Sequence, residues 1–174
     1  AGGGGAAAPP ERPLAPVLAS LREWLDRLES CLDAALFERA WVALAHEAGK
    51  HLYNEVATEA TFSGPGAEAF AADCGQVFSL WARLARRPAN YFKALKEALV
   101  VLRLERSRAL LLADELEHIL IFRRGDATDE EFPDPAPGSE PEGAMPVLRS
   151  LQLQRLTRTM VARVLSQRQD VGCC

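Results

Sequence analysis

Apolar side chains recur at steps of three and four residues along the first third of the chain, and no proline interrupts residues 17–61. The spacing is that of one face of an α-helix. The positions are Leu18, Leu21, Leu25, Leu28, Leu32, Ala35, Leu36, Phe37, Trp41, Leu44, Ala48, Leu52 and Val56. We expect a helix of roughly 40 residues, about 60 Å long if unbroken, with Gly49 as its weak point. Such a length favours a rod.

The remaining patterned segments are also helical. Ser63–Gly66 reads as a turn, followed by a helix over residues 67–86. Pro88 suits the first turn of the next helix, and Ser107 is the expected N-cap of another that runs towards Phe122. A final helix is expected over residues 156–168, after a short helix and a bend. The fold class is therefore all-α, an elongated helical bundle or rod.

Composition divides the chain into four parts. Residues 1–16 are rich in Ala, Gly and Pro and are expected to be disordered, and residues 17–124 form the helical rod domain. Residues 125–143 carry seven acidic residues, several prolines and no Lys or Arg, as expected of a solvated linker. Residues 144–172 are expected to form a basic helix that packs on the rod.

Charge and composition exclude several function classes. The formal net charge of −4 argues against a nucleic-acid-binding domain, which is usually strongly basic. No window approaches the 18 or so apolar residues of a membrane span. The cysteines Cys31, Cys74, Cys173 and Cys174 form no C-x-x-C motif, so a reducing cytosol is expected.

No constellation of residues indicates catalysis. His46 and His51 are five residues apart, whereas a zinc-protease helix needs histidines four apart on one face. Cys31 and Cys74 fall in apolar helical stripes, where a thiol acts as a small hydrophobe. We therefore expect no enzyme activity, no metal site, no cofactor and no small-molecule substrate.

Basic side chains supply the candidate partner-binding residues. Lys93 and Lys96 follow a cluster of arginines, and Arg155, Arg158 and Arg163 lie in a stretch with no acid between Ala144 and Gln169. Either a solvated helix face or a docking surface for an acidic protein or an anionic membrane explains such clusters.

Two further pairs of residues are candidates. Tyr91 and Phe92 point about 100° apart on a helix, so that one is buried and the other could line a groove. The terminal Cys173–Cys174 pair is either an unmodified tail or a site of lipidation.

One segment resembles a known family in its sequence motifs. Residues 87–114 match RPxNYFKxxKEA followed by LxLxxxxALLLxD, and the chain matches again at LFERAW and LYNEV upstream. Downstream matches are Leu151, Leu153, Leu156, Val164, Leu165, Arg168 and Asp170. In these features the chain is similar to the C-terminal portion of the RINT/Tip family. Because the family proteins are much longer and no initiator Met is present, we expect a fragment.

The resemblance implies a fold and a function. The fold would be the C-terminal domain of a CATCHR-type tethering subunit. The function would be non-catalytic, within the Dsl (NRZ) complex that captures Golgi-derived vesicles at the endoplasmic reticulum (ER). Implied partners are the other tethering subunits and the N-terminal helical domains of ER SNAREs, with peripheral membrane contact from the cytoplasm. A scaffold in DNA-damage and cell-cycle checkpoint signalling, a lipid-anchored adaptor and a generic interaction module remain alternatives.

Overall fold

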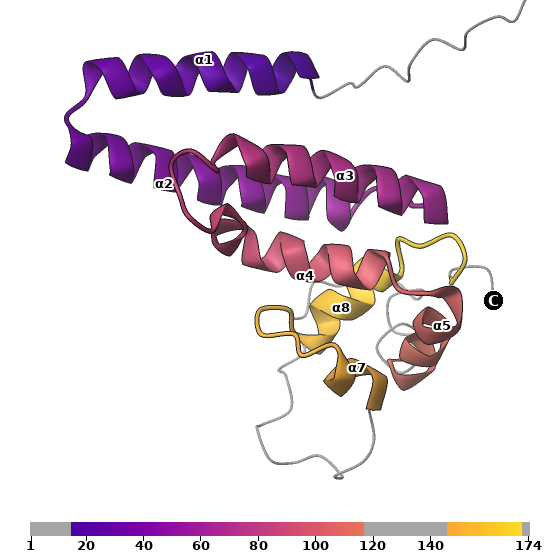
Figure 1. Ribbon diagram of the computed structural model, residues 1–174. Helices are drawn as coiled ribbons and strands as arrows, with labels where there is room; N and C mark the ends of the chain where they lie inside the picture. Colours follow the sequence, from indigo (N-terminus) through magenta and orange to yellow (C-terminus); the bar gives the residue numbers. More distant parts are fainter. Residues whose placement is uncertain (1–14, 117–145, 172–174) are drawn as a thin grey trace, which may run out of the picture. The chain divides into compact units, whose positions relative to one another are not determined.

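The computed structural model describes residues 15–116 and 146–171, and these residues are helical, with no named strand among them (Figure 1). This confirms the predicted all-α class. The chain divides into two compact units, residues 1–42 and residues 43–174, with the boundary inside the second helix. Of the N-terminus predicted to be disordered, residues 1–14 lie outside the described residues, as does the acidic segment 125–143, whereas Ala15 and Pro16 begin a helix.

The first unit holds α1 (Ala15–Cys31) and the beginning of α2 (Ala34–His51). The prediction of one unbroken helix is wrong, because the chain breaks at Asp33. The Asp33 Oδ1 atom accepts hydrogen bonds from the backbone N–H groups of Ala35 (3.0 Å) and Leu36 (2.9 Å), which starts a new helix. Cys31, just before the break, is exposed rather than packed in an apolar stripe.

In the second unit, α2 passes through Gly49 without a break and continues into a π-helix, η1 (Leu52–Ala57). Gly49 is thus not the weak point that its helix propensity suggests. It is buried, and a Cβ atom added there would lie 3.0 Å from Cδ1 of Phe92. The glycine therefore permits the close approach of an aromatic ring.

The third helix, α3 (Gly64–Leu80), begins inside the segment predicted as a turn, residues 63–66, and ends six residues before the predicted end at Arg86. The Ser63 hydroxyl accepts a hydrogen bond from the Gly66 N–H at 3.2 Å, and Pro65 occupies the first turn, where no intrahelical N–H is needed. Cys74 on this helix is buried, and burial raises the pKa of its thiol to about 12. A neutral, inert thiol agrees with the predicted structural role of Cys74.

The segment that carries the family-like motif, residues 87–114, folds into three short elements: the 3₁₀-helix η2 (Pro88–Phe92), α4 (Lys93–Leu102) and α5 (Arg106–Glu115). Pro88 stands in the first turn, as predicted. The predicted N-cap at Ser107 is wrong, since the N-cap is Glu105, two residues earlier, and α5 begins at Arg106. Five residues of α4 are buried, namely Leu95, Ala98, Leu99, Val101 and Leu102.

The C-terminal part contains α7 (Pro146–Ser150) and α8 (Arg158–Leu165), drawn in orange and yellow in Figure 1. Between them the chain bends at Gln152, whose φ of 50° is in the left-handed region. The bend and the short preceding helix agree with the sequence pattern. Helix α8 packs on α4 and α7 packs on α5, so that residues far apart in sequence form one core.

Candidate functional site

The carboxylate of Glu97 fixes the C-terminal segment to α4. Its Oε1 atom accepts a hydrogen bond from the Gln154 N–H (3.0 Å), and its Oε2 atom accepts two more, from the Arg155 N–H (2.9 Å) and the Leu156 N–H (3.0 Å). Three consecutive backbone donors thus converge on one carboxylate. Charge-assisted bonds of this kind are stronger than neutral ones, so residues 154–156, which lead into α8, have a defined position.

Arg168 makes a second anchor, at the far end of α8. The side chain is 5% exposed, and its Nη1 atom donates to the carbonyl oxygens of Leu104 (2.6 Å) and Val101 (3.3 Å). Its Nε and Nη2 atoms donate to the two carboxylate oxygens of Asp170 at 2.9 and 2.7 Å. The bonds from Arg168 lower the pKa of Asp170. Arg168 therefore donates to one carbonyl in the last turn of α4 and to another just beyond the helix end.

A third anchor joins α5 to α7. The two carboxylate oxygens of Glu115 accept hydrogen bonds from the N–H groups of Val147 (2.8 Å) and Leu148 (3.0 Å). Beside these anchors, the backbone of Phe62 exchanges hydrogen bonds with that of Gln167 (2.7 Å) and Gln169 (2.9 Å). Residues 146–171 are thus attached to the earlier helices by polar bonds at both ends.

Tyr91 and Phe92 have different environments. Phe92 is 1% exposed and packs on Phe78 and Trp81, with ring centroids 4.8 and 5.3 Å apart. As a partner-binding candidate Phe92 is therefore wrong, because its side chain does not reach the surface. Tyr91 is partly exposed and meets the edge of His46 at 5.6 Å. It remains a candidate surface residue.

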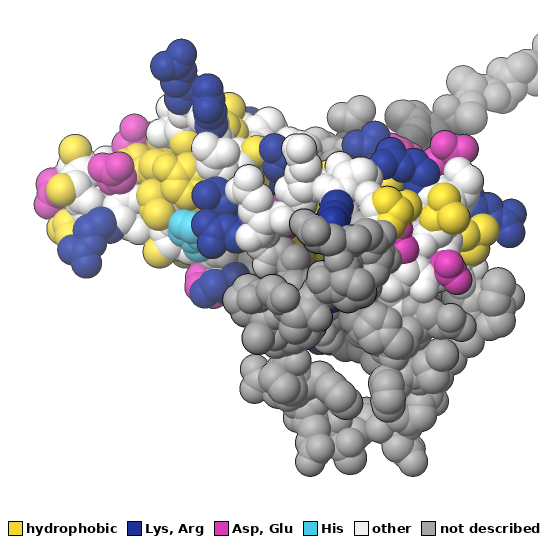
Figure 2. Space-filling model, turned by 90° about the horizontal axis from the view of Figure 1, so that it is seen from below, with side chains coloured by type: hydrophobic (Ala, Val, Ile, Leu, Met, Phe, Trp, Pro, Cys, Tyr) yellow, Lys and Arg dark blue, Asp and Glu magenta, His cyan; other side chains and the backbone are white. Residues whose placement is uncertain are grey.

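Lys93 and Lys96 are exposed on the outer side of α4. Neither forms an ion pair with another residue in the described part of the chain, whereas Arg103, further along α4, pairs with Glu68 at 2.9 Å. That bond raises the pKa of Arg103. Figure 2 shows Lys and Arg side chains standing at the surface on the face that it presents. The two lysines are available to an acidic partner.

The three predicted arginines of the C-terminal segment are not equivalent. Arg163 forms an ion pair with Glu59, so it contributes to the attachment of α8. Arg155 is exposed, and its backbone N–H is one of the three held by Glu97. Arg158 lines a cavity together with Arg149. The predicted Cys173 and Cys174 site lies outside the described residues.

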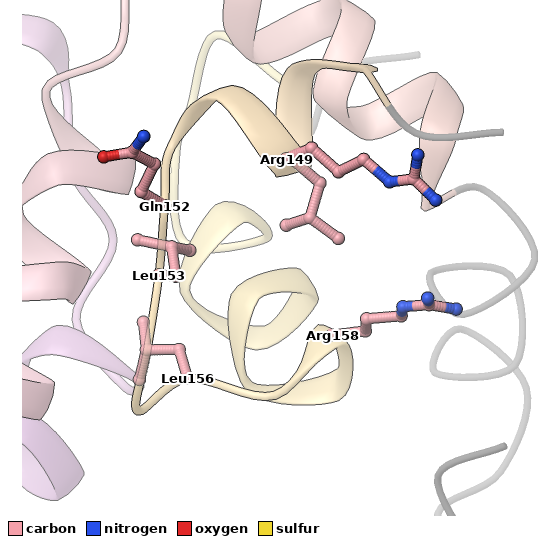
Figure 3. A pocket seen from close by; sticks show the side chains of 6 residues that line it. Arg149, Gln152, Leu153, Leu156 and Arg158 are labelled. Carbon is pink, nitrogen blue, oxygen red and sulfur yellow. The ribbon is translucent and has the colours of Figure 1, made fainter. Parts of the chain in front are cut away.

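The cavity lies between α7, the bend at Gln152 and the start of α8 (Figure 3). Its volume is about 220 Å³, and it is lined by Leu148, Arg149, Gln152, Leu153, Leu156 and Arg158. In Figure 3 the guanidinium groups of Arg149 and Arg158 extend towards the same side, while Leu153 and Leu156 lie on the opposite wall. An apolar wall with two cations at one side suits an amphipathic acidic ligand.

Other features of the described residues bear on the candidate chemistry. Within residues 15–116 and 146–171, no helix is long and apolar enough to cross a membrane. In the same ranges no three His, Cys, Asp or Glu side chains come together as a metal site would require. His46 meets Tyr91, and His51 is exposed at the end of α2.

Comparison with known proteins gives the family. The family model described as the RINT-1/TIP-1 family matches residues 6–168, which is nearly the whole chain. The chain belongs to this family. Membership indicates a tethering role in retrograde transport to the ER, with protein partners in a tethering complex. No solved structure matches the chain.

Several residues that carry the resemblance prove to be structural. Phe92 is in the core, Glu97 and Arg168 are anchors, and Asp170 orients Arg168. Sequence reasoning did not assign a role to Glu97 or Glu115, nor did it find the cavity. For Glu97 a signal existed, because it belongs to the KEA end of the quoted motif. For Glu115 and the cavity we see no such signal.

Proposed function

We propose that this chain is a non-catalytic part of an ER tethering subunit, and that its second unit binds the N-terminal helical domain of an ER SNARE. In this proposal it acts on the cytoplasmic side of the membrane, as a peripheral component of a Dsl-type complex. Family membership supports the tethering part. The SNARE is the partner that the family resemblance implies, and the exposed cations of the second unit support a contact with it.

One observation carries the inference: exposed cations that form no ion pair within the described residues stand on elements whose position is fixed. Lys93 and Lys96 are exposed on α4, a helix whose other side is buried. Arg155 follows a backbone bend held by the Glu97 carboxylate. A surface that is already ordered loses little conformational entropy when a partner binds. Its positive charge speeds encounter with an acidic helix and sets the register.

No step of this function needs turnover. A tether works by holding two membranes close and by stabilising assembling SNAREs, and helix-in-groove contacts provide the free energy. Partly exposed Tyr91 is suited to the edge of such a contact, because aromatic side chains bury a large area with few rotatable bonds.

The test is a calorimetric titration of the full chain with the N-terminal domain of a Sec-twenty-type ER SNARE. We expect a dissociation constant of about 1–10 μM. Reversing both lysines, Lys93→Glu with Lys96→Glu, is expected to weaken binding by at least about tenfold. The control is Arg22→Glu with Arg39→Glu, which makes the same change in net charge on exposed positions of the first unit.

The outcomes separate the two parts of the proposal. Binding that the lysine reversal weakens and the control leaves unchanged supports the contact and locates it on α4. Equal weakening by both pairs indicates non-specific attraction and contradicts a defined surface. Absence of binding by a chain with its full helical circular dichroism signal contradicts SNARE engagement, while family membership is unaffected.

A further inference from the structure

The cavity beside α7 and α8 has the dimensions of a pocket for one side chain. Its volume of about 220 Å³ is below the roughly 300–1,000 Å³ of small-molecule sites. Leu148, Leu153 and Leu156 make its apolar lining. A space of this size and polarity suits one large apolar side chain rather than a metabolite or a cofactor.

The wall of the cavity is built from strained backbone that is held in place. Gln152 has a φ of 50°, and it lines the cavity with Leu153 and Leu156. A non-glycine residue in the left-handed region costs about 1 kcal/mol or more unless its surroundings compensate. Two residues further along the chain, the backbone N–H groups of residues 154–156 donate to the Glu97 carboxylate. The bend is thus fixed before any ligand arrives, as expected of a pre-organised binding pocket.

The charge around the cavity selects the kind of ligand. Arg149 is exposed, and its guanidinium group extends towards the same side of the cavity as that of Arg158 (Figure 3). The carboxylate of Glu115 lies at the start of α7, but both of its oxygens accept backbone hydrogen bonds. Planar guanidinium groups bind carboxylates in a bidentate manner, so an acidic ligand is favoured.

We propose that the cavity formed by Leu148, Arg149, Gln152, Leu153, Leu156 and Arg158 anchors an acidic amphipathic helix of a protein partner. One large apolar side chain of that helix enters against the leucines, and a carboxylate one turn away pairs with Arg149. This inference deepens the proposed function by naming the contact, and rests on it for the partner's identity. Its residues are other than the lysines of α4.

The experiment uses a synthetic probe that does not depend on a SNARE. The probe is a fluorescein-labelled helical peptide of Glu and Leu with one central Phe, about 15 residues long so that it forms a helix. Anisotropy with the full chain is expected to give a dissociation constant of about 10–100 μM. Amide chemical shifts of Gln152, Leu153 and Leu156 are expected to move more than those of α3.

Two changes test the two parts of the pocket. Arg149→Glu, at an exposed position, is expected to weaken binding by at least about tenfold, whereas Arg39→Glu on α2, with the same change in net charge, leaves it unchanged. In the probe, Phe→Ala is expected to weaken binding by a similar factor of about ten, because a buried aromatic anchor carries much of the affinity. A probe with Lys in place of Glu is expected not to bind.

Each contrary result overturns the proposal. These are no binding by a chain of normal helicity, equal weakening by Arg149→Glu and Arg39→Glu, or no effect of the Phe→Ala change in the probe. The SNARE titration is scored separately. A chain that binds the SNARE domain but not the probe loses the pocket and keeps the proposed function. A chain that binds the probe but not the SNARE domain keeps the pocket and loses the SNARE contact.

Discussion

Helix α4 and the C-terminal segment 146–171 both belong to the second unit, but different forces hold them. Helix α4 is held by burial, since half of its ten residues are buried apolar side chains. The C-terminal segment buries the inner side of α8, yet its ends depend on polar anchors from Glu97, Glu115 and Arg168. Apolar burial is non-directional, so it favours packing of the helix without fixing its exact position. The hydrogen bonds of the anchors are directional, so they fix where the segment attaches.

The comparison predicts the largest loss of stability at Phe92, where α4 meets the core. Phe92→Ala removes a ring that packs on Phe78, Trp81 and Gly49. We expect the free energy of unfolding to fall by about 3–5 kcal/mol, measured by urea denaturation. Tyr91→Ala is the control: this neighbour is partly exposed, and a loss of about 1 kcal/mol or less is expected. Equal losses at the two positions would contradict the assignment of Phe92 to the core.

The second-largest effect is expected at the buried arginine. Arg168→Met keeps most of the side-chain volume but removes the donor to the Leu104 carbonyl and to the Asp170 carboxylate, while the Val101 carbonyl keeps its bond from the Leu104 N–H. We expect a loss of about 3 kcal/mol, since removing one member of a buried polar cluster leaves the others unsatisfied. Arg149→Met, at an exposed position, is the matched control and should change stability by less than about 0.5 kcal/mol. Hydrogen exchange should show α8 opening first in the Arg168 variant. A loss confined to other helices would contradict its role as an anchor.

These two kinds of force also explain what the sequence could predict. Period-3.6 patterns predicted the helical class and the burial of one of Tyr91 and Phe92, because burial depends on local spacing. The absence of proline from residues 17–61 indicated a continuous helix, and it gave no sign of the break at Asp33, although a side-chain N-cap is itself a local signal. The Glu97 anchor joins residues more than fifty positions apart, and no pattern of neighbours encodes such a pair. The cavity depends on the left-handed backbone conformation of Gln152, and a glutamine in the sequence does not predict that conformation.

A smaller effect is expected from weakening the carboxylate anchor on α4. Glu97→Gln keeps the size but turns one acceptor oxygen into an NH₂ group that faces backbone N–H donors. We expect a loss of about 1–2 kcal/mol and faster amide exchange at residues 154–156. Glu68→Gln is the control, because its exposed pair with Arg103 should contribute less than about 1 kcal/mol. If both changes had equal effects, the three bonds to Glu97 would be no stronger than a surface ion pair.

The smallest expected effect is a pH dependence from Asp170, which separates charge from packing in the C-terminal anchor. Hydrogen bonds from Arg168 lower the pKa of Asp170, so its folded pKa lies below the unfolded value of about 3.9. The carboxylate therefore stabilises the fold at pH values above about 4, and this contribution is lost as the pH falls through the folded pKa. We expect Asp170→Asn to lower the free energy of unfolding by about 1 kcal/mol between pH 5 and 7, since Asp170 is partly exposed. Below about pH 4 the difference from the unsubstituted chain should shrink. Urea titrations at a series of pH values measure this difference. If this stability difference does not change with pH, Asp170 acts through its shape and neutral hydrogen bonds. The charge of the anchor then acts only through the bonds from Arg168 to the backbone carbonyls.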